Sequence, residues 1–122
     1  MQAQALLDVA FGAEEWIKSL AHQTTNGYRW GLAAERPDKS VPTLYLGSAG
    51  IALFYLELFQ ATHESSYLET AIAAGDDIIS QFPQLTPTCA PMGGWVGYMF
   101  FFNELAKRSG EHRFAEAAHT CA

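Results

Sequence analysis

The sequence predicts an all-α protein built from helical hairpins that repeat along the chain. The first observation is that residues 47–71 align with residues 94–118 at an offset of 47 residues, with eight identities. The second is that each stretch opens with a helix that is apolar on nearly every side and continues with an amphipathic helix. A helix of the first kind must be covered on both sides, and one of the second kind on a single side. This alternation of inner and outer helices is typical of an α/α toroid, or of an arc cut from one.

Length and composition limit the class of protein. The 122 residues suit a single domain, and 49% of them are hydrophobic. A net charge of −6 without a basic stripe excludes a binder that follows nucleic-acid phosphates. No apolar run reaches the roughly 20 residues of a membrane span, and the N-terminus lacks the pattern of a secretion signal. With only two cysteines, Cys89 and Cys121, we expect a cytoplasmic protein with reduced thiols.

The N-terminal third is expected to contain one helix and one long connection. Residues 3–21 predict a helix with one apolar side, formed by Ala3, Leu6, Leu7, Ala10, Ile17, Leu20 and Ala21. Residues 23–46 are rich in turn formers and predict a loop. Tyr28 and Trp30 lie within this loop, where they either pin it to the body or serve a functional flap.

Two hairpin units follow. The first, residues 47–81, has its helices at about 47–62 and 66–81, and Asp76 and Asp77 are expected to point outward. Residues 82–93 contain three prolines and form a connector that cannot be helical throughout. The second unit, residues 94–122, has a helix that stops at Gly110 and a shorter amphipathic helix. The chain therefore predicts an open arc of about five helices.

Four short segments resemble the lanthionine synthetase C-like (LanC-like) family of α/α toroids: residues 27–30 (GYRW), 47–52 (GSAGIA), 56–58 (LEL) and 67–71 (YLETA). The resemblance covers the chain from residue 27 onward. It implies a cyclase activity in which a zinc-activated peptide cysteine thiolate adds to a dehydrated serine or threonine. It also implies that two cysteines and a histidine from a later part of the chain hold the zinc. Neither Cys89 nor Cys121 stands in the family's Cys-His-Gly motif, so no catalytic residue, zinc ligand or cofactor is assigned here. The sequence looks like the N-terminal segment of a family member, or a relic of one, without catalysis by itself.

The remaining candidate metal and catalytic patterns are weak. His112 and His119 lie about 10.5 Å apart along a helix, too far for one zinc ion. His119 and Cys121 diverge by about 200° around a helix, and adjacent Asp76 and Asp77 by about 100°. The glycine turns at residues 47–50 and 94–97 lack both the lysine and the preceding strand of a phosphate-binding loop.

Six residues form the candidate substrate-binding set: Tyr28, Trp30, Glu57, Trp95, Tyr98 and Glu104. Glu57 and Glu104 recur at the same position of two apolar helices. They are either hydrogen-bonded groups near a helix end or acids that line a cavity, with a pKa raised by burial. Trp95 and Tyr98 either line a binding surface at the start of an inner helix or belong to the core.

Three hypotheses about function remain. The first is a LanC-like segment that binds peptide; the second is a carbohydrate-active α/α barrel of the six-hairpin type; the third is a helical-repeat interaction module. Exposure of the aromatic and acidic candidates in one cleft would favour the second, and burial of all of them the third. An open arc would also expose Phe100, Phe101 and Phe102, which predicts either a homodimer or coverage by the remainder of a longer toroid.

Overall fold

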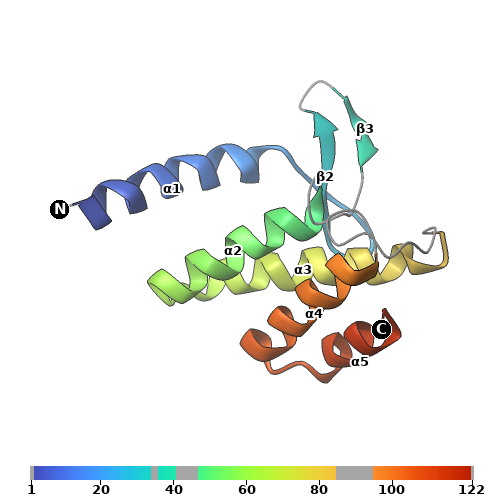
Figure 1. Cartoon of the computed structure of the whole chain (residues 1–122). Coiled ribbons are helices and arrows are strands. Elements are labelled where there is room, and N and C mark those ends of the chain that lie inside the picture. Colours follow the sequence, from blue (N-terminus) through green and yellow to red (C-terminus); the bar gives the residue numbers. More distant parts are fainter. Residues whose placement is uncertain (1, 34–35, 41–46, 85–94, 122) are drawn as a thin grey trace.

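The computed structural model describes residues 2–33, 36–40, 47–84 and 95–121. Helical hairpins form the body of the molecule, which confirms the predicted all-α class of hairpin repeats (Figure 1). The helices are α1 (Gln2–Ser19), α2 (Ser48–Thr62), α3 (Ser65–Gln81), α4 (Trp95–Ser109) and α5 (His112–Thr120). None of them combines the length and hydrophobicity that a membrane span requires.

The two hairpin units have the same turn. Helices α2 and α4 are both 15 residues long and are offset by 47 residues, as are the starts of α3 and α5. After the first helix of each unit, one residue takes the left-handed conformation: His63 with φ 58° and Gly110 with φ 72°. The backbone N–H of this residue donates to the carbonyl of Phe59 at 2.7 Å or of Ala106 at 2.9 Å. The repeat seen in the sequence therefore extends to the backbone hydrogen bonds of the turns.

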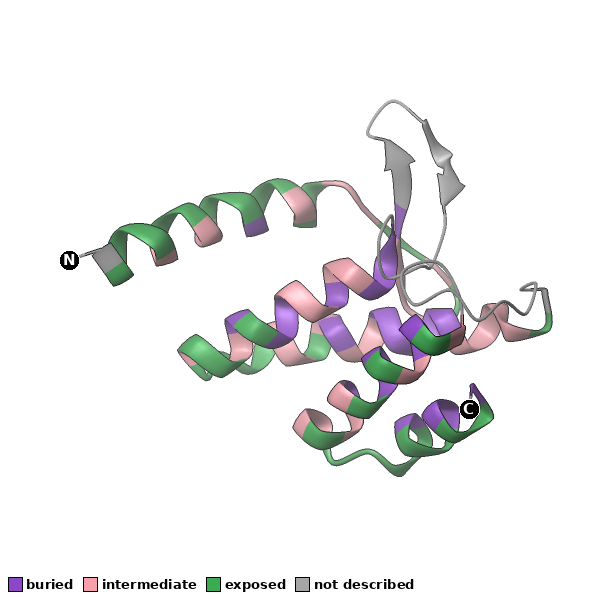
Figure 2. Cartoon of the chain, viewed as in Figure 1, coloured by how far each residue is buried: buried purple, intermediate pink, exposed green. Residues whose placement is uncertain are grey.

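The core lies where α4 crosses the α2–α3 hairpin (Figure 2). Its largest fully buried apolar side chains are Tyr55, Leu56, Ile78, Phe101, Phe102, Leu105 and Phe114. Burial of each such side chain contributes about 1.5–3 kcal/mol. The expectation that three consecutive phenylalanines are exposed is wrong for Phe101 and Phe102, because these two face the core. Phe100 remains 51% exposed.

The segment expected to be a loop contains regular structure. Strands β1 (Ala21–Gln23), β2 (Tyr28–Ala33) and β3 (Arg36–Ser40) form an antiparallel sheet in that order. A tight turn, closed by the Thr24 N–H donating to the Gly27 carbonyl at 2.7 Å, joins β1 to β2 and sets the pairing of Gln23 with Tyr28. The loop prediction is therefore incorrect for Gln23 and for residues 28–33 and 36–40. Residues 34–35 and 41–46 lie outside the described part.

Two further predicted segments differ in their ends. The first helix stops at Ser19, and Ala21 already belongs to β1. The connector begins with a 3₁₀ helix, η1 (Phe82–Gln84), and its remaining residues 85–93 lie outside the described residues.

Helix α1 lies along the edge of the molecule and has two different sides (Figures 1 and 2). Toward the body, Glu14 is buried, and the partly buried side chains are Leu7, Ala10, Phe11 and Ile17. The other side is exposed. The sequence placed Leu6 on the packed side, but its side chain is 72% exposed. The α1 helix thus presents apolar residues to the body and to solvent.

Candidate functional site

A buried carboxylate fastens the β1–β2 turn to α3. Asp77 is fully buried, so the expectation that it points outward is wrong. Arg29 donates to its two oxygens, from Nε and Nη2, at 3.0 Å each. The Thr24 hydroxyl donates at 2.7 Å and the Gln81 amide at 2.9 Å. A buried charge is tolerated when it is paired and fully hydrogen-bonded, and Asp77 meets both conditions.

Close backbone packing completes this attachment. A Cβ atom on Gly27 would lie 1.9 Å from the carbonyl oxygen of Ala73 on α3, so a side chain cannot be accommodated at that position. The segment of residues 27–30 therefore combines a close approach at its glycine with an ion pair at Arg29. These two contacts hold the turn against the middle of α3.

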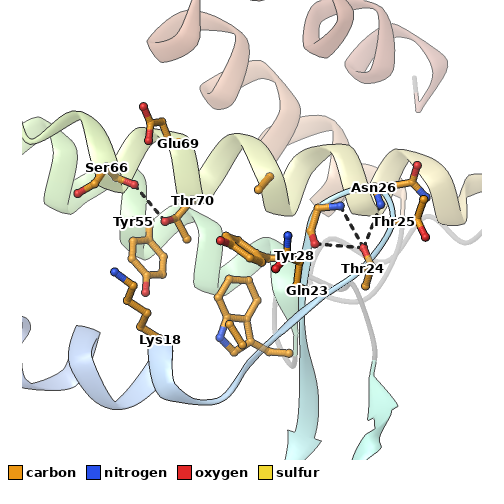
Figure 3. Close-up of a pocket in the computed structure, with 14 residues that line it drawn as sticks. Lys18, Gln23, Thr24, Thr25, Asn26, Tyr28, Tyr55, Ser66, Glu69 and Thr70 are labelled. Carbon is orange, nitrogen blue, oxygen red and sulfur yellow. Dashed lines mark hydrogen bonds between the residues drawn. The ribbon is translucent and has the colours of Figure 1, made fainter.

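Beside the turn lies a groove of about 670 Å³. We call it the turn groove; it is lined by Lys18, Ala21, Gln23, Thr24, Thr25, Asn26, Gly27, Tyr28, Trp30, Tyr55, Ser66, Glu69, Thr70 and Ala73. Figure 3 shows the turn residues Thr24, Thr25 and Asn26 at one end, and Lys18 extending toward Tyr55 and Ser66 at the other. The groove thus offers the partly exposed ring of Tyr28 next to hydroxyl and amide groups, with the buried Trp30 and Tyr55 behind it.

The aromatic wall of the groove is held rigidly. Trp30 is buried, its ring centroid is 6.2 Å from that of Tyr55, and its Nε1–H donates to the Ile17 carbonyl at 2.9 Å. The Tyr55 hydroxyl donates to Glu14 Oε2 at 2.8 Å. Burial, and next the hydrogen bond to Glu14, raise the pKa of Tyr55 well above its ordinary range. Tyr55 therefore stays protonated and works as a structural donor.

The recurring glutamates lie in a different cleft. This cleft of about 380 Å³ lies between α2 and α4 and has Leu53, Phe54 and Phe100 among its walls. Arg108 Nη2 is 3.6 Å from both Glu57 Oε1 and Glu104 Oε2. One arginine therefore bridges the two carboxylates, an arrangement typical of a structural ion-pair network.

Trp95 and Tyr98 take part in aromatic packing at the start of α4. The Phe82 centroid lies 5.3 Å from Trp95 and 6.5 Å from Tyr98. Tyr98 is only 4% exposed. Burial, with a smaller effect of Cys121, raises the pKa of Tyr98 to about 12. Both residues join η1 to the body.

Comparison with known protein families shows which family the chain belongs to. The family model of lanthionine synthetase C-like proteins matches residues 39–122, a span that includes both hairpin units. The chain belongs to this family. Searches of the curated proteins and of the solved structures found no match to the chain.

In this LanC-like chain the six predicted site residues divide among three places. Tyr28 and Trp30 share the turn groove, Glu57 and Glu104 share the cleft at Arg108, and Trp95 and Tyr98 lie in the aromatic contact with η1. Sequence reasoning missed Asp77 and Tyr55 as the residues that shape the groove. The GYRW segment, residues 27–30, contains Arg29 and was the sequence signal that pointed to the region of the turn groove.

The zinc that the LanC-like family implies does not fit the described residues. Among residues 2–33, 36–40, 47–84 and 95–121, no three His, Cys, Asp or Glu side chains gather in a group that could hold a metal. Cys121 is buried, and this burial raises the pKa of its thiol to about 11, which disfavours the thiolate that zinc requires. Cys89 lies outside the described residues.

Proposed function

We propose that this LanC-like segment binds peptide in the turn groove and has no catalysis by itself. The observation that carries the proposal is the groove's composition: the ring of Tyr28 and the wall of Trp30 and Tyr55 lie beside hydroxyl and amide side chains. Aromatic faces accept apolar side chains, and polar groups accept the backbone of an extended chain. The three-stranded order β1-β2-β3 makes β1 an edge strand, and Ala21 and Gln23 of β1 line the groove. An extended peptide adds naturally to such an edge.

The test is a titration of the chain with short linear peptides that contain Ser, Thr and Cys, the residues on which LanC-like cyclases are expected to act. Trp30 lies in the groove wall, so we expect tryptophan fluorescence to change with peptide concentration in a chain whose other two tryptophans, Trp16 and Trp95, are replaced by Phe. Tyr28→Ala should weaken binding by about tenfold, because it removes one aromatic face. Phe100→Ala, in the other cleft, is the matched control and should bind as the unchanged chain does. Equal binding by both variants, or no saturable response, would contradict the proposal.

The carbohydrate-active alternative has less support. A glycosidase needs two carboxylates beside the sugar-stacking aromatic residues. Here Glu57 and Glu104 are bridged by Arg108, in a different cleft from Tyr28 and Trp30. The third candidate, a helical-repeat interaction module, required burial of all these candidates; Tyr98 is buried, but the Glu57 side chain is 71% exposed. A failure of peptide binding with intact folding would favour this candidate.

We further propose that the two hairpin units work as part of a longer ring. The support is the apolar surface of the inner helix α4, where Phe100 is 51% and Val96 37% exposed. Additional hairpin units in the flanking coding sequence would bear this out, and a stop codon directly after residue 122 would count against it. A cytoplasmic location belongs to the same proposal and is supported by the buried free thiol of Cys121.

A further inference from the structure

One side of α1 carries an exposed apolar stripe formed by Leu6, Val9, Ala13 and Trp16, which we call the α1 stripe. The side chains of Leu6, Val9 and Trp16 are 72%, 71% and 63% exposed. Successive members are three, four and three residues apart, which is the spacing of the contact positions in a coiled coil. Large apolar residues at this spacing and exposure point to a helical partner.

The α1 stripe is independent of the contacts that hold α1 to the body. Those contacts are made by Glu14, which accepts the Tyr55 hydroxyl, and by Ile17, whose carbonyl accepts the Trp30 indole. Helix α1 is therefore already packed on the body through another side, and all four stripe residues are exposed. Figure 2 shows that much of the α1 ribbon is exposed. A partner can cover the stripe without disturbing the fold.

The positions on one flank of the α1 stripe favour close approach of an uncharged helix face. On one flank the residues are Ala5, Gly12 and Ser19, all small. A Cβ placed on Gly12 would meet no atom within 4 Å, so this flank is open. By the same periodicity the charged residues Asp8 and Glu15, four residues before and three after Gly12, border this flank on the side away from the stripe. Because the stripe itself carries no charge, two copies that meet on the stripe place no like charges directly opposite each other.

We propose that the α1 stripes of two chains pair as antiparallel helices and form a homodimer. In this arrangement Leu6 faces Trp16 and Val9 faces Ala13, so each layer combines a larger and a smaller side chain. A parallel pair would place Trp16 against Trp16 and would bring the two bodies side by side. The two-fold contact is closed, so it stops at two copies.

The size of the contact sets the strength of the dimer. A helix of 18 residues is about 27 Å long, and the stripe spans less than two heptads. Such a contact buries less than the about 800 Å² per partner of a standard stable interface. The dimer should therefore be weak, and the dimeric fraction should fall as the chain is diluted.

Sedimentation velocity of the 122-residue chain over a range of concentrations tests the proposal. Val9→Glu places a charge in the middle of the stripe and should weaken dimerisation by at least about tenfold, with an unchanged helical circular dichroism spectrum. Phe100→Glu is the matched control, because it adds the same charge at an exposed apolar residue of α4, and it should dimerise as the unchanged chain does. A chain that is monomeric at every concentration overturns the proposal. Equal behaviour of the two variants, or a dimer lost only with Phe100→Glu, also overturns it.

Small-angle X-ray scattering at a concentration that favours the dimer tests the orientation. Antiparallel helices carry the two bodies at opposite ends of the pair and give an elongated particle. A dimer no longer than a side-by-side arrangement of two bodies overturns the antiparallel pairing.

Discussion

The two hairpin units have the same turn but differ in the polarity of their cores. In the first unit, Tyr55 directs its hydroxyl at Glu14 on α1 and the buried Asp77 binds Arg29 on β2. The position equivalent to Tyr55 in the second unit is Phe102, whose ring lies 4.9 Å from Phe101 and otherwise packs on aromatic neighbours. The comparison shows where buried polar atoms occur in the repeat. They lie at the places where α1 and β2, which are outside the repeat, attach to the first unit.

The largest effect is expected at Asp77. Asp77→Ala removes four hydrogen bonds and leaves Arg29 without its partner, which should lower the free energy of unfolding by about 3 kcal/mol. Chemical denaturation measures the loss, and faster hydrogen exchange at residues 24–27 should accompany it. Asp76→Ala is the control next in sequence, because Asp76 makes an exposed pair with Arg113 and its loss should cost below about 1 kcal/mol. Equal losses for the two variants would show that Asp77 does not anchor the turn.

The next effect is expected at Tyr55. Tyr55→Phe gives the first unit the residue of the second and leaves the buried Glu14 carboxylate without this donor, at a cost of about 2 kcal/mol. Limited proteolysis should cut α1 earlier than in the unchanged chain, since one of its attachments is lost. Tyr67→Phe, a nearby and partly exposed tyrosine, should change stability by less than about 0.5 kcal/mol. An intact α1 in Tyr55→Phe would argue that apolar contacts alone hold this helix.

Substitutions at the left-handed residues of the two hairpin turns, His63 and Gly110, should change stability in opposite directions. Gly110→Ala forces a side chain into a φ of 72° and should destabilise the chain by about 1 kcal/mol. His63→Gly relieves the backbone strain of the same conformation, at φ 58°, and should stabilise the chain by up to about 1 kcal/mol. Thermal unfolding of both variants provides the comparison. Destabilisation by His63→Gly would mean that the imidazole contact with Phe59 outweighs the backbone preference.

The smallest effect is expected at Cys121, which occupies the position of Ala74 in the first unit. Its thiol ionises near 9.0 when exposed, but burial raises its pKa to about 11 in the folded chain. The unfolded chain therefore releases this proton first, so the contribution to stability is complete below pH 9 and declines as the pH rises to about 11. Cys121→Ala should flatten the loss of stability between these pH values. If both proteins lose stability with the same slope against pH, a group other than Cys121 causes the loss.

The repeat made the hairpins predictable from sequence. An offset of 47 residues with Glu57 matching Glu104 located α2 and α4, and the amphipathic stretches after them located α3 and α5. Helical periodicity is local, so it can be read from neighbouring residues. The strands were missed because their pairing depends on partners across a turn and because turn formers surround them.

The site was less predictable because its decisive contacts are distant in sequence. Asp77 looked like a solvent-facing residue of an amphipathic helix, and nothing local signals that Arg29, 48 residues earlier, neutralises it. The Glu57–Arg108–Glu104 bridge depends in the same way on the approach of α2 to α4. Tyr28 and Trp30 were found because aromatic residues are uncommon among turn formers.

The contact between the two outer helices introduces a dependence on ionic strength. Arg113 of α5 donates to both oxygens of Asp76 on α3, at 2.8 and 3.1 Å, and its guanidinium lies 4.5 Å from the centre of the Phe114 ring. This pair is exposed, so dissolved ions screen it, whereas the aromatic contacts inside each unit are insensitive to screening. Added salt should therefore weaken this one contact between the outer helices, whereas the apolar core at the crossing of α4 with the α2–α3 hairpin keeps the two units together.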